Sequence, residues 1–400
     1  MGTAVAAILG FIGVIIGAFW LASIWGAGTE FSSLYQDHPN IEVFGFLTLF
    51  ILGASLTIIP RFKGRKLVSN KLAWESVILV SLGNLLVLFT STRFLVYDDL
   101  LILGGALIAL VLIGINLGRP SGPLALAEPF MWLSVISLFL AVSLKTYFDY
   151  MATNSSWDSF AFLEIIFFSF PTMMIFGIST RTIHFRVARM NKKVVSLAFY
   201  LAVMATSVAA IASILSSGSS LGADLLDASS ILYLACVFAF VLGISAFRDN
   251  MLTDHVRRMN ERDRTRYLYF GRAYRIAVSW IVLAVLLAVV YALFSQDTNL
   301  AGSLFWVRDA FIHSMAIGFL GSMIAAYAPI LLPAVISGRA PYHGLTNLPL
   351  YLVVAGNIWR VGSDLLRASG LLFANLFTGY SGILIVLGVL WFLKMNHTLK

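Results

Sequence analysis

Three polar residues, Asn40, Glu164 and His313, each stand five positions ahead of one recurring sequence pattern. A second histidine, His38, lies two residues before Asn40. An imidazole can ligate haem iron or copper, and a carboxyl group inside a membrane can pass protons. The shared spacing predicts that equivalent helices carry ligand-type and proton-carrying groups at one height.

The recurring pattern is an internal repeat. Residues 45–65 read GFLTLFILGASLTIIPRFKGR and residues 318–339 read GFLGSMIAAYAPILLPAVISGR, with Pro60 and Pro333 fifteen residues after the first glycine. A weaker copy at residues 169–186, SFPTMMIFGISTRTIHFR, places Gly177 where the first copy has Gly53. The helices that contain the three copies are therefore expected to be equivalent.

The composition shows which solvent these helices meet. The chain is 60% hydrophobic and 12% charged, with a mean hydropathy of +0.90, which excludes an ordinary soluble protein and indicates an integral membrane protein. Apolar stretches of about 20 residues predict membrane spans. Twelve such stretches are predicted at residues 4–28, 41–60, 72–92, 99–117, 124–145, 159–180, 194–216, 226–246, 270–294, 306–336, 347–368 and 374–393.

The distribution of basic residues supports this count. With both termini in the cytoplasm, the lysines and arginines fall on the cytoplasmic side, apart from Arg93, Lys145, Arg308, Arg360 and Arg367. Acidic residues such as Asp37 and Asp149 fall in the outer loops, as the positive-inside rule requires. The net charge of +8 is thus explained by a lipid bilayer, with no nucleic acid partner. Its largest block is a cytoplasmic basic loop at residues 248–268, which suits anionic headgroups.

The repeat and the spans together predict the fold class. We expect an all-α integral membrane protein in which twelve transmembrane helices form three pseudo-equivalent four-helix units. The internal repeats span approximately residues 1–118, 119–247 and 269–394 of a single membrane domain, residues 1–400. Asn40, Glu164 and His313 would then lie at one depth, in the outer part of the membrane.

Two histidines are candidate haem or metal ligands. His38 and His313 lie at the outer ends of repeat helices, where an ionisable group is costly to keep. Two histidines on different helices can bind haem b without a covalent motif, and the sequence contains no C-x-x-C-H. A hydrogen-bonded structural histidine is the alternative for each. Cys236 is the single cysteine, so a disulfide or a cysteine-ligated metal centre within the chain is excluded.

Other residues near these histidines can support such a site. Asp37 can orient His38, and Asp309, one helical turn before His313, can orient that imidazole. Met315 can act as a weak thioether ligand, although its spacing from His313 favours simple packing. Asn40 takes the repeat position in the first copy. Glu164 is either a buried proton carrier or an acid bonded to a neighbouring helix near the interface.

The eleventh predicted helix adds a charged stripe. Arg360, Asp364 and Arg367 are spaced four and three residues apart, which places them on one helical face. Arg360 and Asp364 are expected to pair. The stripe can receive an anionic group such as a haem propionate, because Arg binds carboxylates in a bidentate manner. A purely structural ion pair is the alternative.

The passages HPNIEVFGFLTLFILGASLTIIPRFKGR and HSMAIGFLGSMIAAYAPILLPAVISGR resemble the NnrS family. These are bacterial membrane proteins that contain haem and copper and are linked to nitric oxide stress. The family patterns resemble W-H-x-H-E-M-x-F-G-F near the second helix and H-A-x-x-x-G-x-x-G-T-M, followed by G-H-T-G-R, near the tenth. The matching residues are His38, Phe44, Gly45, Phe46, His313, Gly318, Gly321, Met323, Ser337, Gly338 and Arg339.

Departures from the family pattern limit what the resemblance implies. The second histidine of the first pattern is Asn40 here, and the histidine before Ser337 is replaced by Val335 or Ile336. The resemblance therefore favours one haem b over a copper site, in a bacterial or archaeal cytoplasmic (inner) membrane. The arrangement of three four-helix units with ligands on helices 2, 6 and 10 is also similar to subunit I of haem–copper oxidases.

The resemblance favours a multi-pass haem b protein that binds or redox-processes nitric oxide or a related small oxidant, or passes electrons. A cofactor-free transporter or channel is a second hypothesis, because prolines such as Pro60 and Pro171 interrupt repeat helices. A third is a scaffold subunit without cofactors, bound to other subunits of a respiratory membrane complex. No P-loop, dinucleotide-binding or zinc-protease motif occurs in the sequence.

Overall fold

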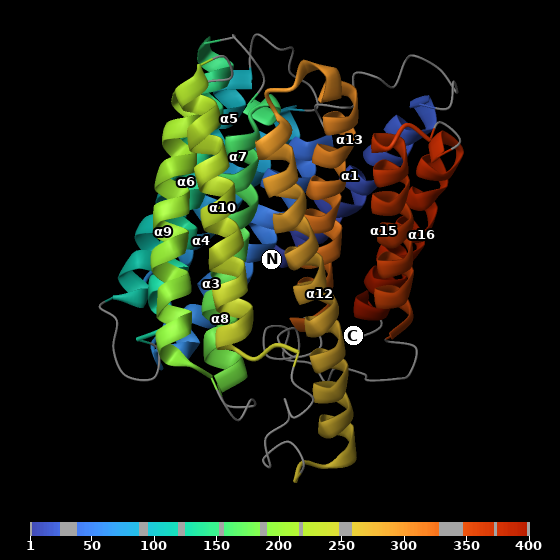
Figure 1. Cartoon of the computed structure of the whole chain (residues 1–400). Helices are drawn as coiled ribbons and strands as arrows, with labels where there is room; N and C mark the ends of the chain where they lie inside the picture. Colours follow the sequence, from blue (N-terminus) through green and yellow to red (C-terminus); the bar gives the residue numbers. More distant parts are fainter. Residues whose placement is uncertain are drawn as a thin grey trace. The chain divides into compact units, whose positions relative to one another are not determined.

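The computed structural model describes residues 2–24, 38–87, 95–118, 125–151, 156–184, 190–215, 219–247, 258–327, 347–371 and 374–397. Within these ranges the chain is helical and contains no strand. In its described part, each of the twelve predicted apolar stretches overlaps one helix or one run of joined helices (Figure 1). The prediction of a helical membrane protein is thereby supported in its coarse form.

The helices have the following bounds in chain order. They are α1 (Gly2–Ile24), the π-helix η2 (Asn40–Leu47) joined to α3 (Thr48–Phe62), α4 (Asn70–Val87), α5 (Leu95–Leu117), α6 (Glu128–Met151), the 3-10 helix η4 (Ser156–Asp158), α7 (Phe160–Glu164) joined through the π-helix η5 (Ile165–Thr172) to α8 (Met173–His184), α9 (Lys192–Leu215), α10 (Ser220–Gly243), α12 (Glu261–Phe294), the 3-10 helix η6 (Thr298–Leu300), α13 (Ala301–His313) joined to the π-helix η7 (Ser314–Gly321), α15 (Asn347–Ala368) and α16 (Ala374–His397).

Eight helical runs in the described parts of the chain are long and apolar enough to cross a membrane. They are Asn40–Phe62, Val96–Leu117, Glu128–Met151, Phe160–Thr182, Lys192–Leu215, Ser220–Gly243, Tyr267–Phe294 and Thr298–Tyr327. Shorter apolar stretches, Val5–Phe19 and Tyr380–Phe392, lie within α1 and α16. Helix α15 carries three charged residues in its C-terminal half, which lowers its hydropathy.

A π-helix of eight residues interrupts each of the three repeat helices. Asn40 is the first residue of η2, Glu164 directly precedes η5, and His313 directly precedes η7. Segments of π-helix are rare and often mark functional sites. The three residues singled out by the repeat therefore share one local structure, the start of a widened helical turn.

Two copies close this turn in the same way. Thr48 Oγ1 donates to the Val43 carbonyl at 2.8 Å, and Thr172 Oγ1 donates to the Phe167 carbonyl at 2.8 Å. Pro171 has no N–H to offer to Phe167, so the threonine hydroxyl supplies the missing donor. The equivalent position in the third copy is Gly321, which has no side chain.

The chain forms two compact units. The first comprises residues 1–178 and 206–222, and the second comprises residues 179–205 and 223–400. In the first unit α4 and α5 pack closely through glycines: a Cβ on Gly83 would lie 2.6 Å from the Asp98 carbonyl, and one on Gly105 would lie 2.8 Å from the Ser76 carbonyl. Such small residues allow helices in membranes to approach closely.

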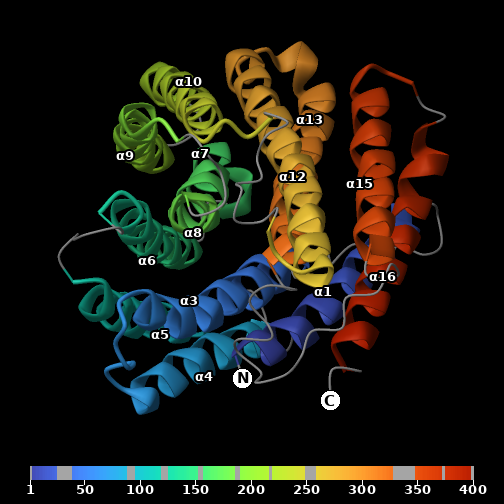
Figure 2. The same ribbon diagram turned by 90° about the horizontal axis from the view of Figure 1, so that it is seen from below.

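The second unit repeats this contact between α15 and α16, which lie side by side in Figure 2. A Cβ on Gly356 would lie 2.8 Å from the Ile385 side chain, and one on Gly388 would lie 3.0 Å from the Pro349 carbonyl. Gly83 and Gly356 each precede an asparagine, at the same distance along the chain from Gly45 and Gly318 respectively. The repeat therefore extends through the helix pair that follows each copy.

Helix α12 has 34 residues and begins at Glu261, so it includes the last part of the predicted basic loop 248–268. Arg264 and Arg272 are exposed on it. Residues 248–257 of that loop lie outside the described ranges. Part of the basic loop is thus helical and continues α12 on the N-terminal side of its apolar stretch.

Candidate functional site

A ladder of polar contacts joins α13 and η7 to α15 in the second unit. Arg367 stacks on Trp306 with its Cζ atom 3.2 Å from the ring centroid. One turn further along α13, Asp309 forms an ion pair with Arg360. The contacts follow opposite chain directions, so α13 and α15 run antiparallel here. The charged stripe predicted for the eleventh helix therefore faces the helix that carries His313.

His313 is held by a hydrogen bond that determines its tautomer. Its Nδ1 lies 2.9 Å from the Asp309 carbonyl oxygen and 3.5 Å from Asp309 Oδ1. A carbonyl oxygen only accepts, so Nδ1 carries the proton and donates, and Nε2 of the neutral ring keeps its lone pair. Histidines that ligate metals are usually held in this way through their other ring nitrogen.

Arg360 is the centre of the charged network. Its side chain is 1% exposed, and it pairs with Asp309 on α13 and lies 3.4 Å from Asp364 Oδ1 on its own helix. The contact with Asp364 is an ion pair rather than a hydrogen bond, because both Asp364 carboxylate oxygens lack a hydrogen-bond partner in the described part of the chain. A buried arginine between two carboxylates fixes the relative position of the two helices.

The same residues do not suit a divalent metal ion. Asp309, His313 and Asp364 offer ligand atoms that lie within 4.8 Å of one another. However, the guanidinium of Arg360 already contacts both carboxylates, and a fixed positive charge at that place repels a cation. A copper or zinc site made of these three side chains is therefore not favoured.

Asn357 closes the π-helical turn of the third copy from α15. With its amide oriented so that donors meet acceptors, its nitrogen donates to the His313 carbonyl at 3.3 Å and its oxygen accepts from Gly318 N–H at 3.2 Å. These are the two backbone groups that an ordinary π-helical hydrogen bond would join. Thr48 and Thr172 bond carbonyls that correspond to Ala316 in the repeat, so Asn357 acts three residues earlier in the turn, at His313 itself.

Replacing Asn357 by leucine is expected to lower the free energy of unfolding by about 1–3 kcal/mol, because two buried backbone groups lose their partners. The measurement is the unfolding midpoint in detergent. Asn84→Leu is the matched control, since the Asn84 amide donates at 2.8 Å only to Val80 of its own helix. Equal losses in the two variants would contradict a role for Asn357 in closing the turn.

His38 occupies a comparable setting in the first unit. Its Nδ1 lies 2.9 Å from the Gly13 carbonyl of α1, and a Cβ on Gly17 would lie 2.7 Å from His38 Cε1. One turn later, Glu42 packs against Gly13, and its Oε1 is buried without a hydrogen-bond partner among the described residues. Glycines of α1 thus create the space for both ionisable side chains.

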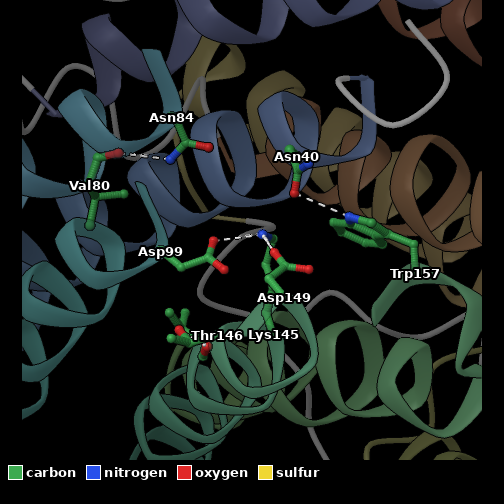
Figure 3. A network of polar contacts seen from close by, with 9 residues as sticks. Asn40, Val80, Asn84, Asp99, Lys145, Thr146, Asp149 and Trp157 are labelled. Atoms are coloured by element: carbon green, nitrogen blue, oxygen red, sulfur yellow. Dashed lines mark hydrogen bonds and ion pairs between the residues drawn. The ribbon is translucent and has the colours of Figure 1, made fainter. Parts of the chain in front are cut away.

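The first unit also contains a buried polar network at η2, α5 and α6, shown in Figure 3. Asn40 accepts a hydrogen bond from Trp157 Nε1 at 3.1 Å. Lys145 Nζ lies between two carboxylates and donates to Asp99 Oδ1 and to Asp149 Oδ2, at 2.6 Å each. The predicted topology placed Lys145 among the few basic residues near the outer side. In the structure it is the 3%-exposed centre of an ion triad.

Two further candidates are fully buried: Glu164 at the end of α7 and Met315 in η7. Asp37 lies outside the described residues, so its proposed contact with His38 has no structural description. His38 belongs to the first compact unit and His313 to the second.

Sequence reasoning missed four residues that the structure places at these sites: Glu42, Lys145, Trp306 and Asn357. A sequence pattern could have identified two of them, Lys145 and Asn357. Lys145 stands four residues before Asp149, a helical ion-pair spacing. Asn357 stands as far from Gly318 as Asn84 stands from Gly45, so a longer repeat alignment would have identified it.

Comparison with known families gives one match. A family model described as a domain of unknown function, DUF8744, matches residues 131–397. This range is more than half of the chain, and it includes the whole ladder between α13 and α15. No curated protein matches the chain.

Proposed function

The chain belongs to the DUF8744 family, and we propose that it is a membrane-integral haem b protein, similar to NnrS, that binds or redox-processes nitric oxide or a related small oxidant, or passes electrons. One observation carries the proposal. His313 has its Nδ1 proton directed at the Asp309 carbonyl, which leaves Nε2 as a ligand inside a membrane helix.

The residues present fit a haem better than a bare metal ion. His313 and His38 each use Nδ1 on a backbone carbonyl, at 2.9 Å in both cases, and no second histidine or thiolate accompanies His313 in its group of possible ligands. Haem supplies the other iron ligands itself, so one or two imidazoles suffice. When bound, haem would provide an iron that binds small gases and exchanges one electron. Copper has no comparable donor set here and is not proposed.

The protein's own groups would then orient and tune the ligand. Asp309 fixes the imidazole plane through its carbonyl and places a carboxylate 3.5 Å from Nδ1. Hydrogen bonding of this kind raises the basicity of an imidazole ligand. Arg360 forms an ion pair with the same Asp309 carboxylate and partly neutralises its charge. The increase in the basicity of His313 therefore depends on how strongly Asp309 pairs with Arg360.

The topology belongs to the same proposal. We propose that all twelve helical runs cross the membrane as three four-helix units, with both termini in the cytoplasm. The charge-rich α15 would cross because its arginines and aspartate face α13 rather than lipid, as intramembrane charges generally do. Multi-pass insertion in a bacterial or archaeal cytoplasmic membrane would follow.

The test is an absorption spectrum of the full-length protein purified from haem-producing cells. We expect a Soret band and a haem-to-protein ratio that falls at least tenfold in His313→Ala. The predicted cytoplasmic-loop variant His343→Ala serves as the control and should keep the wild-type ratio. A wild-type protein without bound haem, or a His313→Ala variant with the full Soret band, would refute the proposal.

A transporter or channel without a cofactor is the second candidate. The buried ladder of Arg360, Asp309 and Asp364 favours it, because charges within a membrane often mark substrate or ion pathways. Substrate-dependent flux into proteoliposomes by haem-free protein would support this alternative. Stable co-purification of the haem-free chain with other membrane subunits would instead support a scaffold.

A further inference from the structure

The charges in the ladder between α13 and α15 do not cancel. Arg308, the neighbour of Asp309 on α13, interacts electrostatically with the Asp309 carboxylate and so belongs to the same cluster of charges. With Arg360 and Arg367 it brings three positive charges, and Asp309 and Asp364 bring at most two negative ones. If a proton sits on either carboxyl group, the excess positive charge becomes larger. In the described parts of the chain, these five residues make no hydrogen bond or ion pair other than the contacts described above. Arg308 and Arg367 are partly buried beside the fully buried Arg360, so an anion bound there would compensate the excess positive charge.

Unused hydrogen-bond donors lie on the same arginines. Arg360 Nε and Arg367 Nη1 are buried and have no hydrogen-bond partner among the described residues, and Arg360 Nη1 meets only Asp364 Oδ1, at the 3.4 Å of an ion pair. Arg360 is 1% exposed, so water at the protein surface does not reach it. Burying such donors without acceptors costs free energy, and the oxygens of a bound anion would supply the missing acceptors.

The position of Arg367 leaves its edge available to a ligand. The Trp306 ring covers one face of the guanidinium at 3.2 Å, an attractive contact that also fixes the guanidinium plane. The N–H groups point outward in that plane. A planar fork of donors matches two coplanar oxygens, as in a carboxylate, better than it matches a spherical ion.

We propose that Arg360 and Arg367 bind a planar monovalent anion of the carboxylate type. Formate and nitrite share the required pair of coplanar oxygens. The anion can come from two sources, a free small molecule or a carboxylate of a larger ligand such as a haem propionate. The site uses only residues of the second unit and does not require haem, so the proposal is independent of the function proposed above.

The test measures the thermal unfolding midpoint of full-length, haem-free protein in detergent during titration with sodium formate at constant ionic strength. A ligand that binds the folded state raises the midpoint in a saturable way. We expect saturable stabilisation by formate and by nitrite, and at least a tenfold weaker apparent affinity in Arg367→Gln. Arg272→Gln removes the same charge from an exposed position of α12 in the same unit and should behave as wild type.

Arg360→Lys provides a second variant that keeps the charge facing Asp309 while removing the planar fork, and it should also weaken formate binding. Stabilisation by sodium chloride equal to that by formate would overturn the proposal, as would unchanged formate affinity in Arg367→Gln. Repeating the titration on haem-loaded protein separates the sources: loss of the formate response there identifies a haem carboxylate as the occupant. A retained response identifies a free anion. Failure to bind haem would leave the haem-free titration unaffected.

Discussion

Lys145→Met is expected to lower the free energy of unfolding by about 3–5 kcal/mol, the usual cost of removing one partner from a buried ion pair. Lys145 is 3% exposed and bonds Asp99 and Asp149, which are 0% and 11% exposed. Methionine has a similar length, so little packing volume is lost and the effect reports the charge. Both carboxylates would lose their cation, and Asp99 Oδ2 already lacks a partner in the described part of the chain.

The chain offers a matched control for this experiment. Lys71 and Glu75 form a pair with the same four-residue spacing as Lys145 and Asp149, but their side chains are 88% and 41% exposed. Lys71→Met should therefore change stability by at most about 0.5 kcal/mol. Adding Asp99→Asn to Lys145→Met should recover part of the loss, because one unpaired charge is removed. Equal unfolding midpoints for the two lysine variants would show that the triad is not a buried ion pair.

The helices were largely predictable from the sequence because lipid imposes a simple rule. A helix that spans a membrane needs about 20 apolar residues, and the stretch predicted at residues 194–216, for example, corresponds to α9 at Lys192–Leu215. The internal repeat was also readable, since Gly45 and Gly318 open nearly identical segments. The π-helices were not predicted, because no local residue pattern distinguishes a widened turn from an ordinary one.

The candidate site was predictable only where its residues share one helix. The spacing of Arg360, Asp364 and Arg367 placed them on a common face without knowledge of any partner. The partners of that face depend on packing between helices. Arg360 pairs most closely with Asp309, which is 51 residues away in the sequence, rather than with its neighbour Asp364. Asp309 was expected to orient His313, and the structure adds that its carboxylate also holds Arg360.

The three copies of the repeat satisfy the backbone of the π-helical segment with different residues and at different places. Thr48 and Thr172 bond carbonyls of their own helices, whereas Asn357 joins the His313 carbonyl to Gly318 N–H from α15. In the second copy, Ser169 occupies the position of Gly45 and Gly318 and bonds Thr206 at 2.8 Å. The third copy combines a histidine, an external amide and an ion-pair network, so its site depends on side chains of the neighbouring helix α15.

Gly318→Leu is expected to destabilise the protein by about 3 kcal/mol, at the upper end of overpacking effects. A Cβ at this position would lie 2.6 Å from Trp280 Cγ and Cδ2 and 2.9 Å from Asn357 Nδ2. Trp280 is only 8% exposed, so its ring has little room to move. Gly362→Leu is the matched control, because a Cβ there would meet no atom within 4 Å.

The same substitution links packing to the proposed chemistry. Gly318 N–H is one of the two groups that Asn357 holds, and the other is the carbonyl of His313. Displacing Asn357 should therefore tilt the His313 backbone and reduce the haem-to-protein ratio together with the unfolding midpoint, whereas Gly362→Leu should leave both at the wild-type value. A Gly318→Leu protein with a lowered midpoint but an unchanged Soret band would separate the two effects, and it would show that the His313 ligand does not depend on the π-helical turn.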